Sequence, residues 1–308
     1  MWRCVVAGAF SFVACTTAIP RGTAVDLQPC GPEDDRAAIR CGSLSVPENP
    51  DRPDGQQIRL HFAVVPAEQP RPGAAPLFIL EGGPGIAASE GGSFFLAEGS
   101  EYRRDRDVVL VDQRGTGRSN PLRCPASERL GPLQPLYTVA AVEACRDDLE
   151  KIADLTMYST EIAAGDLDRV RHALGHDQID IWSLSYGTRL ALTYIKRDPA
   201  RVRSAVLVGF APLDYRTPLY HAAAAQRVLD LVFYSCQMEP ACSARYPDLR
   251  REWDGLLERF DGGPIRIGDA GVARGPFTEA LRGILTMAAG QRALPRIITR
   301  AAAGDFEP

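Results

Sequence analysis

Short apolar runs recur along much of the chain, with helical patterns between them. The runs lie at residues 76–80, 107–112, 178–183 and 203–210. Runs of this length, rich in Val, Ile and Leu, are typical of strands that a parallel sheet buries on both faces. Because strand and helix alternate through this part of the chain, the pattern predicts an α/β fold with a mainly parallel sheet.

Amphipathic periodicity predicts two helices in the same part of the chain. In residues 160–175 the apolar positions share one face, and we expect Thr160 to cap the start and Gly175 the end. A second helix is predicted for residues 186–197. Residues 57–67 mix apolar and polar positions and are expected to form an outer strand.

The pattern changes after Asp214, where helical runs dominate and little is typical of a strand. We therefore expect residues 40–214 to form the α/β core. Residues 215–308 are expected to form a helical lobe packed over the sheet.

Gly-containing turns follow three of the predicted buried strands, at residues 81–85 (EGGPG), 112–119 (DQRGTGRS) and 183–187 (SLSYG). Ligands bind at the carboxyl ends of parallel strands, so these turns should converge on one site. The glycines of the first turn leave backbone N–H groups free, as an oxyanion hole requires. Small residues around Ser185 permit a tight strand–turn–helix elbow that would hold its hydroxyl out toward a carbonyl.

In this order on successive strands, the turns resemble the α/β-hydrolase fold, and within it the prolyl iminopeptidase and tripeptidyl aminopeptidase family of serine exopeptidases. The resemblance covers about residues 41–214. It rests on the stretches CGSLSVPENP, GGPG, DQRGTGRSNPLRC, AAGDLDRVRHALG and SLSYGTRLAL. It implies a mainly parallel sheet with a helical cap at residues 215–308.

The same resemblance implies roles for individual residues. Ser185 would be the nucleophile, and the N–H of Tyr186 together with that of Gly83 (or Gly82) would form the oxyanion hole. Arg114, in the second turn, would tie backbone carbonyls together behind the site, since its five donors suit that task.

This sequence departs from the family pattern at two positions. Ser183 replaces the first glycine of the elbow, which its small size allows. Glu81 stands where many relatives carry a histidine. Its carboxylate could satisfy local backbone donors, which we favour, or hold a substrate amine.

The base that activates the serine is not evident. In this fold the order along the chain is nucleophile, acid, histidine, and His221 is the only histidine after Ser185. Asp214 is topologically allowed as an acid, although the family carries its acid later. The other histidines are His61, on the predicted outer strand, and His172 and His176, which are expected on the surface.

The family continues past the position of Pro308 with further strands, an acid and a histidine. The sequence therefore leads us to expect a truncated member that lacks the last strands, the triad acid and the triad histidine, and that has little activity. The strand near Val206 would then be an open sheet edge.

Composition narrows the classes of partner. The chain has 45% apolar and 24% charged residues and a net charge of −4, with both signs interspersed. No basic face suited to nucleic acid stands out. No cysteine spacing with a nearby histidine suggests a metal, and no cofactor is expected. The expected partner is a peptide or a small acyl substrate.

The N-terminus and the cysteines indicate export. Residues 1–20 have a short positive start and an apolar run typical of a signal peptide. The stretch ending at Cys15 resembles a lipobox, so a lipid on Cys15 would be the one link to a membrane; ordinary cleavage near residue 18 is the alternative. Of the 8 cysteines, setting aside Cys4 and Cys15 leaves six. Six allow 15 disulfide connectivities. Pairing of sequence neighbours is the simplest: 30–41, 124–145 and 236–242.

Three hypotheses follow. The first is an exported serine hydrolase that cleaves peptides with a free N-terminus through an acyl-enzyme on Ser185. The second is an esterase or amidase with the same nucleophile and small acyl substrates. The third is a non-catalytic envelope protein.

Overall fold

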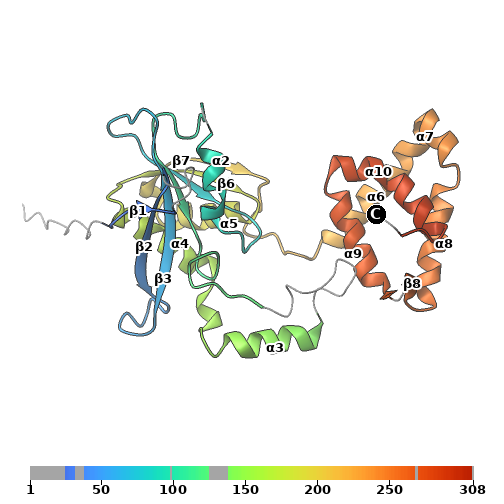
Figure 1. Ribbon diagram of the computed structural model, residues 1–308, viewed down its shortest axis with the longest axis horizontal. Helices are drawn as coiled ribbons and strands as arrows, with labels where there is room; N and C mark the ends of the chain where they lie inside the picture. Colours follow the sequence, from blue (N-terminus) through green and yellow to red (C-terminus); the bar gives the residue numbers. More distant parts are fainter. Residues whose placement is uncertain (1–24, 32–37, 98, 125–137, 268–269, 307–308) are drawn as a thin grey trace, which may run out of the picture. The chain divides into compact units, whose positions relative to one another are not determined.

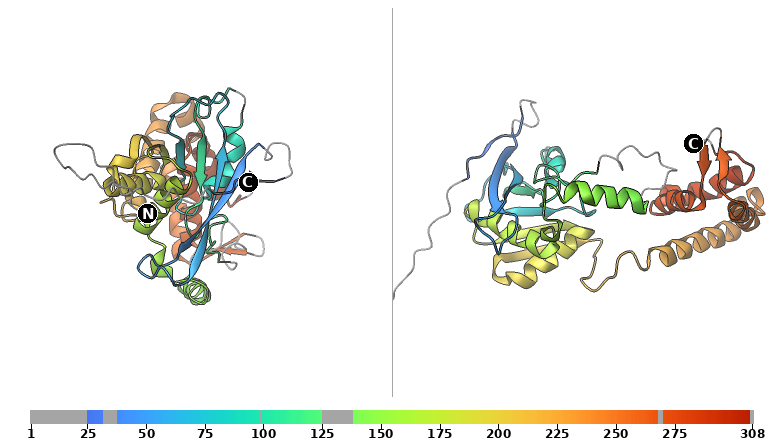
Figure 2. Two further views of the ribbon diagram at one scale, coloured as in Figure 1. Left: turned by 90° about the vertical axis from the view of Figure 1, so that its left-hand side faces the viewer. Right: turned by 90° about the horizontal axis from the view of Figure 1, so that it is seen from below.

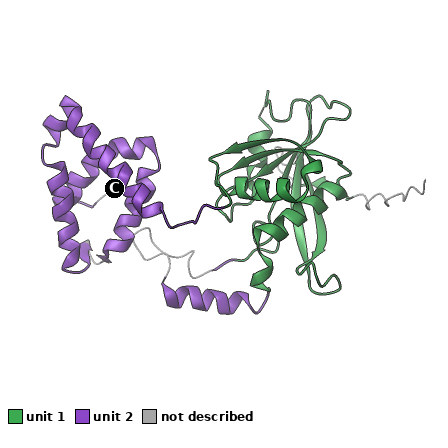
Figure 3. Ribbon diagram, turned by 180° about the vertical axis from the view of Figure 1, so that it is seen from behind, with its two compact units in different colours: residues 1–122, 153–213 green, residues 123–152, 214–308 purple. Residues whose placement is uncertain are grey.

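The computed structural model describes residues 25–31, 38–97, 99–124, 138–267 and 270–306. The predicted signal peptide and Cys15 lie outside these residues. The chain divides into two units, which Figure 3 colours separately. Unit 1 holds residues 1–122 and 153–213, and unit 2 holds residues 123–152 and 214–308.

Unit 1 is built on a 7-stranded sheet with the order β1-β2-β3-β5-β4-β6-β7 (Figure 1). The strands β5, β4, β6 and β7 run parallel to one another, as the apolar runs predicted. The strands β1, β2 and β3 join them in antiparallel fashion, so the sheet is mixed. The strands are β1 Gln28–Pro29, β2 Arg40–Pro47, β3 Gln57–Val65, β4 Leu77–Leu80, β5 Val108–Val111, β6 Ile179–Leu184 and β7 Val202–Val208.

Residues 57–67 were predicted to form an outer strand. They do contain the strand β3, but the predicted place at the outside of the sheet was wrong. β3 has β2 on one side and β5 on the other, and all but two of its residues are buried. Its polar residues misled the sequence argument because one of them, His61, is itself buried within the sheet.

Helices α4 (Thr160–Ala173) and α5 (Tyr186–Arg197) lie side by side on one face of this sheet (Figures 1 and 2). Their apolar faces, including Leu167 and Tyr194, share one buried cluster with strands β2 to β6. The residue that caps α4 is Ser159, whose hydroxyl accepts from Ile162 N, and not Thr160 as expected. Both residue types are good caps, and the sequence pattern does not show that the backbone turns helical only after Ser159.

Short elements cover the other face. They are the 3-10 turn η1 (Ala88–Gly91) and α2 (Gly92–Phe95), and Phe95 packs there against strand residues such as Val108. Two further 3-10 turns, η2 (Leu155–Met157) and η3 (Pro199–Arg201), connect the strands and helices of unit 1.

Strand β7 differs from the buried strand that its sequence predicts. Among the strands of the described residues, it pairs with β6 alone, and Val206 and Val208 are 54% and 39% exposed. An apolar run shows that a strand can be buried, but whether another element covers it is decided by the rest of the fold. The result is an open sheet edge with apolar side chains, as expected for the strand near Val206.

Unit 2 is mainly helical. A single core, which includes Leu256, Leu294 and Ile298, holds α6, α8, α9 and α10 together. A two-stranded hairpin, β8 with β9, was not predicted, because each strand has only three residues. The elements are α3 Val139–Leu149, α6 His221–Met238, α7 Pro240–Arg245, α8 Leu249–Asp261, β8 Ile265–Ile267, β9 Ala270–Val272, α9 Arg274–Leu285 and α10 Ala288–Ala302.

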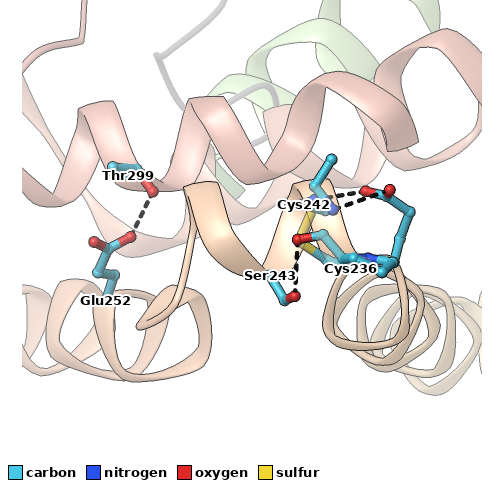
Figure 4. The surroundings of a disulfide bond; sticks show 8 residues. Cys236, Cys242, Ser243, Glu252 and Thr299 are labelled. Atoms are coloured by element: carbon cyan, nitrogen blue, oxygen red, sulfur yellow. Dashed lines mark hydrogen bonds between the residues drawn. A yellow bond between two sulfur atoms is a disulfide. The ribbon is translucent and has the colours of Figure 1, made fainter.

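The disulfides join sequence neighbours, as the simplest pairing predicted: Cys30–Cys41, Cys124–Cys145 and Cys236–Cys242. The last of these ties α6 to α7, and Figure 4 shows it near a hydrogen bond of 2.5 Å from Thr299 Oγ1 to Glu252 Oε2, which links α10 to α8. In the described part of the chain, no helix combines the length and the apolar character that crossing a bilayer needs.

A buried carboxylate stabilises the strand that leads to the candidate nucleophile. Asp180 on β6 is 2% exposed and accepts from Arg106 at 2.6 Å, from Ser204 at 2.6 Å and from Arg203 at 2.9 Å. Burial alone would raise the pKa of Asp180. The hydrogen bonds from Arg203 and Ser204 and the charges of the two arginines outweigh it, so the pKa lies below its usual value.

We expect Asp180→Asn to lower the free energy of unfolding at pH 7 by about 2 kcal/mol, less than for a fully buried pair because both arginines reach solvent. A lowered folded pKa adds stability above the unfolded pKa, and that stability is lost as the pH falls through the folded value. In urea unfolding from pH 7 down to pH 3, the parent should therefore lose stability that the variant already lacks. Asp147→Asn, in an exposed pair with Arg146, is the control and should cost almost nothing. Equal losses in the two variants would contradict this role for Asp180.

The open edge of β7 predicts self-association of the 308-residue chain. Val206→Lys should reduce it, because a charge on an edge strand opposes pairing with another strand. Light scattering over a range of protein concentrations measures the effect. Val142→Lys, on α3 of unit 2 and 51% exposed in the parent, is the control for adding charge at an exposed apolar position outside the sheet strands. If both substitutions change association equally, the β7 edge is not responsible.

Candidate active site

Ser185 stands at the junction of β6 and α5, in a backbone conformation that few residues adopt. Its φ is 52° and its ψ is −121°, and it is the N-cap residue of α5. A non-glycine residue in such a region costs roughly 1–3 kcal/mol and persists only where its surroundings enforce it. The side chain is exposed, so the strained turn presents the hydroxyl to solvent.

Two close approaches surround this elbow. A Cβ added to Gly187 would stand 2.0 Å from the carbonyl oxygen of Leu80, at the end of β4. A Cβ added to Gly82 would stand 3.0 Å from Ser185 Cβ and 3.7 Å from Ser185 Oγ. The glycines therefore let α5 approach β4 and let the first Gly turn lie directly beside Ser185.

The first Gly turn has the backbone freedom that its sequence suggested. Gly83 adopts φ 100° and Gly85 φ 113°, which glycine alone adopts without strain. Of the two glycines considered for the oxyanion hole, Gly82 is the one that lies against Ser185. The peptide N–H of Tyr186 follows Ser185 directly at the start of α5.

Ser183 explains how the elbow tolerates the loss of its usual glycine. The residue is fully buried, and its hydroxyl donates to the carbonyl of Val206 at 3.1 Å. A small polar side chain therefore fits here and satisfies its hydrogen bond within the β6–β7 pair.

The second turn connects the sheet to the first turn. The buried carboxylate of Asp112 accepts from Ser89 N and Ser89 Oγ, both at 2.9 Å, and from Arg118 N at 3.1 Å. Ser119 Oγ donates to the Asp112 carbonyl at 2.7 Å. These contacts hold residues 112–119 against the segment that follows the Gly-Gly turn. The second turn therefore helps to fix the position of the first.

Arg114 ties carbonyls together, as expected. Its guanidinium donates to Glu48 O at 2.7 Å and to Met157 O at 2.8 Å. It also forms a two-point ion pair with Asp166, at 2.6 and 2.9 Å, in which both side chains are buried. Burial raises the pKa of Asp166, and the charge of Arg114 opposes that rise. Arg114 is thus fully engaged in structure.

Glu81 does not make the local hydrogen bonds that we favoured. Among contacts between described residues, its carboxylate has no backbone donor, and the side chain is half-buried at the end of β4. The turn instead relies on the glycine conformations of Gly83 and Gly85.

No histidine of unit 1 bonds to Ser185 Oγ in the part of the chain that the structure describes. His61 lies on β3, where its Nε2 is 3.6 Å from Cys41 Sγ. Burial lowers the pKa of His61, while Asp112 raises it and Arg118 lowers it further. His172 is exposed and His176 half-buried at the end of α4. His221 belongs to unit 2, where it lines a 520 Å³ cavity with residues such as Trp253 and Glu279.

A strained serine between a parallel strand and a helix, beside a Gly-Gly turn, is typical of one fold family. The sequence model of the alpha/beta hydrolase fold family matches residues 75–233. This span is more than half of the chain and includes all three turns. The chain belongs to the α/β-hydrolase fold family.

Several peptidases are among the relatives of this α/β hydrolase. It is 31% identical to the serine protease Hip1 of Mycobacterium tuberculosis over 239 residues, which cover 68% of this chain and 45% of Hip1. It is 28% identical to the tripeptidyl aminopeptidase of Streptomyces lividans over 188 residues, 55% of this chain and 35% of that one. It is 30% identical to the proline iminopeptidase of Neisseria gonorrhoeae over 143 residues, which cover 46% of this chain and 34% of that protein. The chain thus spans about half, or less, of the length of these relatives.

The contact between α5 and β4 makes Gly187 the most restrictive position of this α/β-hydrolase elbow. We expect Gly187→Ala to lower the free energy of unfolding by about 3 kcal/mol, because the new methyl group meets a backbone carbonyl that cannot rotate away. Urea unfolding followed by circular dichroism measures the change. Gly255→Ala, on α8 with open space around it, should be neutral or slightly stabilising. A Gly187→Ala protein as stable as the parent would show that α5 can move away from β4.

Proposed function

We propose that this protein is an exported serine hydrolase that cleaves peptides with a free N-terminus through an acyl-enzyme on Ser185. One observation carries the proposal: the strained backbone of Ser185 at the start of α5, with Gly82 against its side chain. No structural need explains a strained, exposed serine at this position, whereas a nucleophile requires that exposure.

In the proposed reaction, Ser185 Oγ attacks the carbonyl carbon of the scissile bond and loses its proton. The carbonyl oxygen becomes an oxyanion, which the N–H groups of Tyr186 and of Gly82 or Gly83 would stabilise. The tetrahedral intermediate collapses, the C–N bond breaks, and the amine leaves with a proton. Water then hydrolyses the ester on Ser185 and restores the hydroxyl.

The substrate class rests on the names of the relatives, which include a tripeptidyl aminopeptidase and a proline iminopeptidase. Glu81 is consistent with it, because its half-buried carboxylate has no backbone partner among the described residues and lies one residue before Gly82. A protonated amine of the substrate could bind there.

A non-catalytic role is the second candidate, and one observation favours it. Within the described residues, the hydroxyl of Ser185 has no hydrogen bond to a histidine, and a serine without a base is a weak nucleophile. An esterase or amidase would use the same serine, and substrate choice separates it from a peptidase.

We expect the 308-residue chain to hydrolyse an aminoacyl anilide slowly and to react slowly with a fluorophosphonate, at Ser185 alone. Without an engaged base, an oxyanion hole and substrate binding typically give about 10³–10⁴-fold acceleration over water. Ser185→Ala should abolish the labelling, because the reagent bonds to the Ser185 oxygen, and it should leave only the hydrolysis that the oxyanion hole and binding supply without a nucleophile. Ser183→Ala, which removes a buried hydroxyl two residues earlier, is the control and should keep both reactions.

The substrate panel distinguishes the hypotheses. Faster hydrolysis of short-chain esters and of N-blocked peptides than of free aminoacyl anilides would indicate an esterase or amidase. No reaction with any substrate and no labelling would favour the non-catalytic role. An ordinary enzymatic rate that Ser185→Ala abolishes would mean that a base acts on Ser185, and His221→Ala would then test the one histidine after it.

Export is supported by the disulfides, which persist in oxidising compartments. Mass spectrometry of the protein from its native host should find the N-terminus removed and the six later cysteines without free thiols. If Cys15 is lipidated, the measured mass includes the lipid. The variant Cys15→Ala should then release the protein from the membrane, whereas the control Cys4→Ala should not. An intact Met1 with six free thiols would refute export.

A further inference from the structure

We propose that Thr188 is a positioning residue for Ser185: its hydroxyl holds the strained elbow and fixes the chain segment that leaves β7 beside it. The catalytic part of this proposal rests on the proposed role of Ser185 as a nucleophile. The structural part stands on the hydrogen bonds alone.

The backbone of Ser185 is held from both sides. Its N–H donates to the carbonyl of Val208, at the end of β7, at 2.8 Å. Its carbonyl accepts from Thr188 N at 3.0 Å and from Thr188 Oγ1 at 2.7 Å. A strained conformation persists only where its neighbours enforce it, and these three bonds restrain the backbone of Ser185.

The Thr188 hydroxyl fills two roles at once. While it donates to Ser185 O, it accepts from the N–H of Ala211 at 2.8 Å. The residue is fully buried, so water does not compete for either bond. One oxygen atom therefore joins the elbow, the first turn of α5 and the segment after β7.

The segment from 209 to 213 needs this contact to stay beside the nucleophile. Gly209 adopts φ 62°, and a Cβ on it would stand 3.7 Å from Ser185 N. Arg189, the next residue of α5, donates to Leu213 O at 2.8 Å. Two successive residues of α5 thus bind the segment, one inside the protein and one at the surface.

Only a hydroxyl can perform both roles, since it is a donor and an acceptor. Valine has the shape of threonine without either function, so Thr188→Val removes both bonds with almost no change in volume. Thr188→Ser keeps the hydroxyl and should restore them. Thr193→Val is the matched control, because Thr193 lies on the same helix and its hydroxyl bonds only to Arg189 O, at 2.8 Å.

Hydrogen exchange tests the structural part without any need for activity. In the parent, the Ala211 amide should exchange more slowly than that of Phe210, whose N–H has no hydrogen-bond acceptor among the described residues of unit 1. Thr188→Val should abolish the protection of Ala211, while Thr188→Ser and Thr193→Val should retain it. An unprotected Ala211 amide in the parent, or the same protection in Thr188→Val, overturns the proposal. If Thr188→Val does not fold, Thr188→Ala removes the same hydroxyl without inserting a methyl group.

Fluorophosphonate labelling of Ser185 tests the catalytic part, under conditions where circular dichroism shows every variant folded. We expect the limiting labelling rate of Thr188→Val to fall on the order of tenfold or more, since small displacements of a nucleophile are costly. The reagent concentration at half-saturation should stay unchanged, which a general loss of folding would not produce. Thr188→Ser should recover the rate, and Thr193→Val should keep it. An unchanged rate in Thr188→Val, or no recovery in Thr188→Ser, overturns the positioning role.

The two failures are distinguishable. If Ser185 is not labelled in the parent, the proposed function fails, and hydrogen exchange still decides whether Thr188 holds the segment. If the parent is labelled and Thr188→Val is labelled equally fast, the nucleophile stands and Thr188 does not position it.

Discussion

The amino end of α5 and the carboxyl end of β4 lie so close that no side chain fits between them. Gly187 makes this contact, against the carbonyl of Leu80. Because the helix approaches the strand to this distance, the turn that follows β4 comes directly beside Ser185, where Gly82 touches its side chain. The candidate site therefore depends first on a backbone-to-backbone approach, and the chemistry of its side chains comes after that.

The elbow is strained, and the protein compensates for the strain with hydrogen bonds to the backbone. Ser185 bonds through its N–H to β7 and through its carbonyl to Thr188. Neighbouring strands are arranged in parallel, so the end of β7 lies level with the end of β6 and can supply a carbonyl there. The sheet thus restrains the candidate nucleophile as well as carrying it.

Buried charges stabilise the turns and strands around Ser185 and take no part in the proposed chemistry. Asp112 holds the second turn to the segment after the first, Arg114 with Asp166 ties loops to α4, and Asp180 anchors β6 to its neighbours. Each carboxylate has several donors, as buried carboxylates require. These buried charged groups are thus structural.

The sequence by itself determined the strands β4 to β7, the helices α4 and α5, the three turns, the disulfide pairing by the simplest rule and the candidate nucleophile. These follow from local patterns: apolar runs of strand length, helical periodicity, and glycines where the backbone needs unusual angles. Tertiary structure decided what local pattern cannot contain. It placed β3 inside the sheet and left β7 exposed at its edge, because burial depends on which elements become neighbours. It placed Gly82 against Ser185 and left the Glu81 carboxylate without a local hydrogen-bond partner among the described residues. It also gave the Thr188 hydroxyl a bond from Ala211, which lies 23 positions later in the chain. Such contacts exist only once separate strands and helices have packed together.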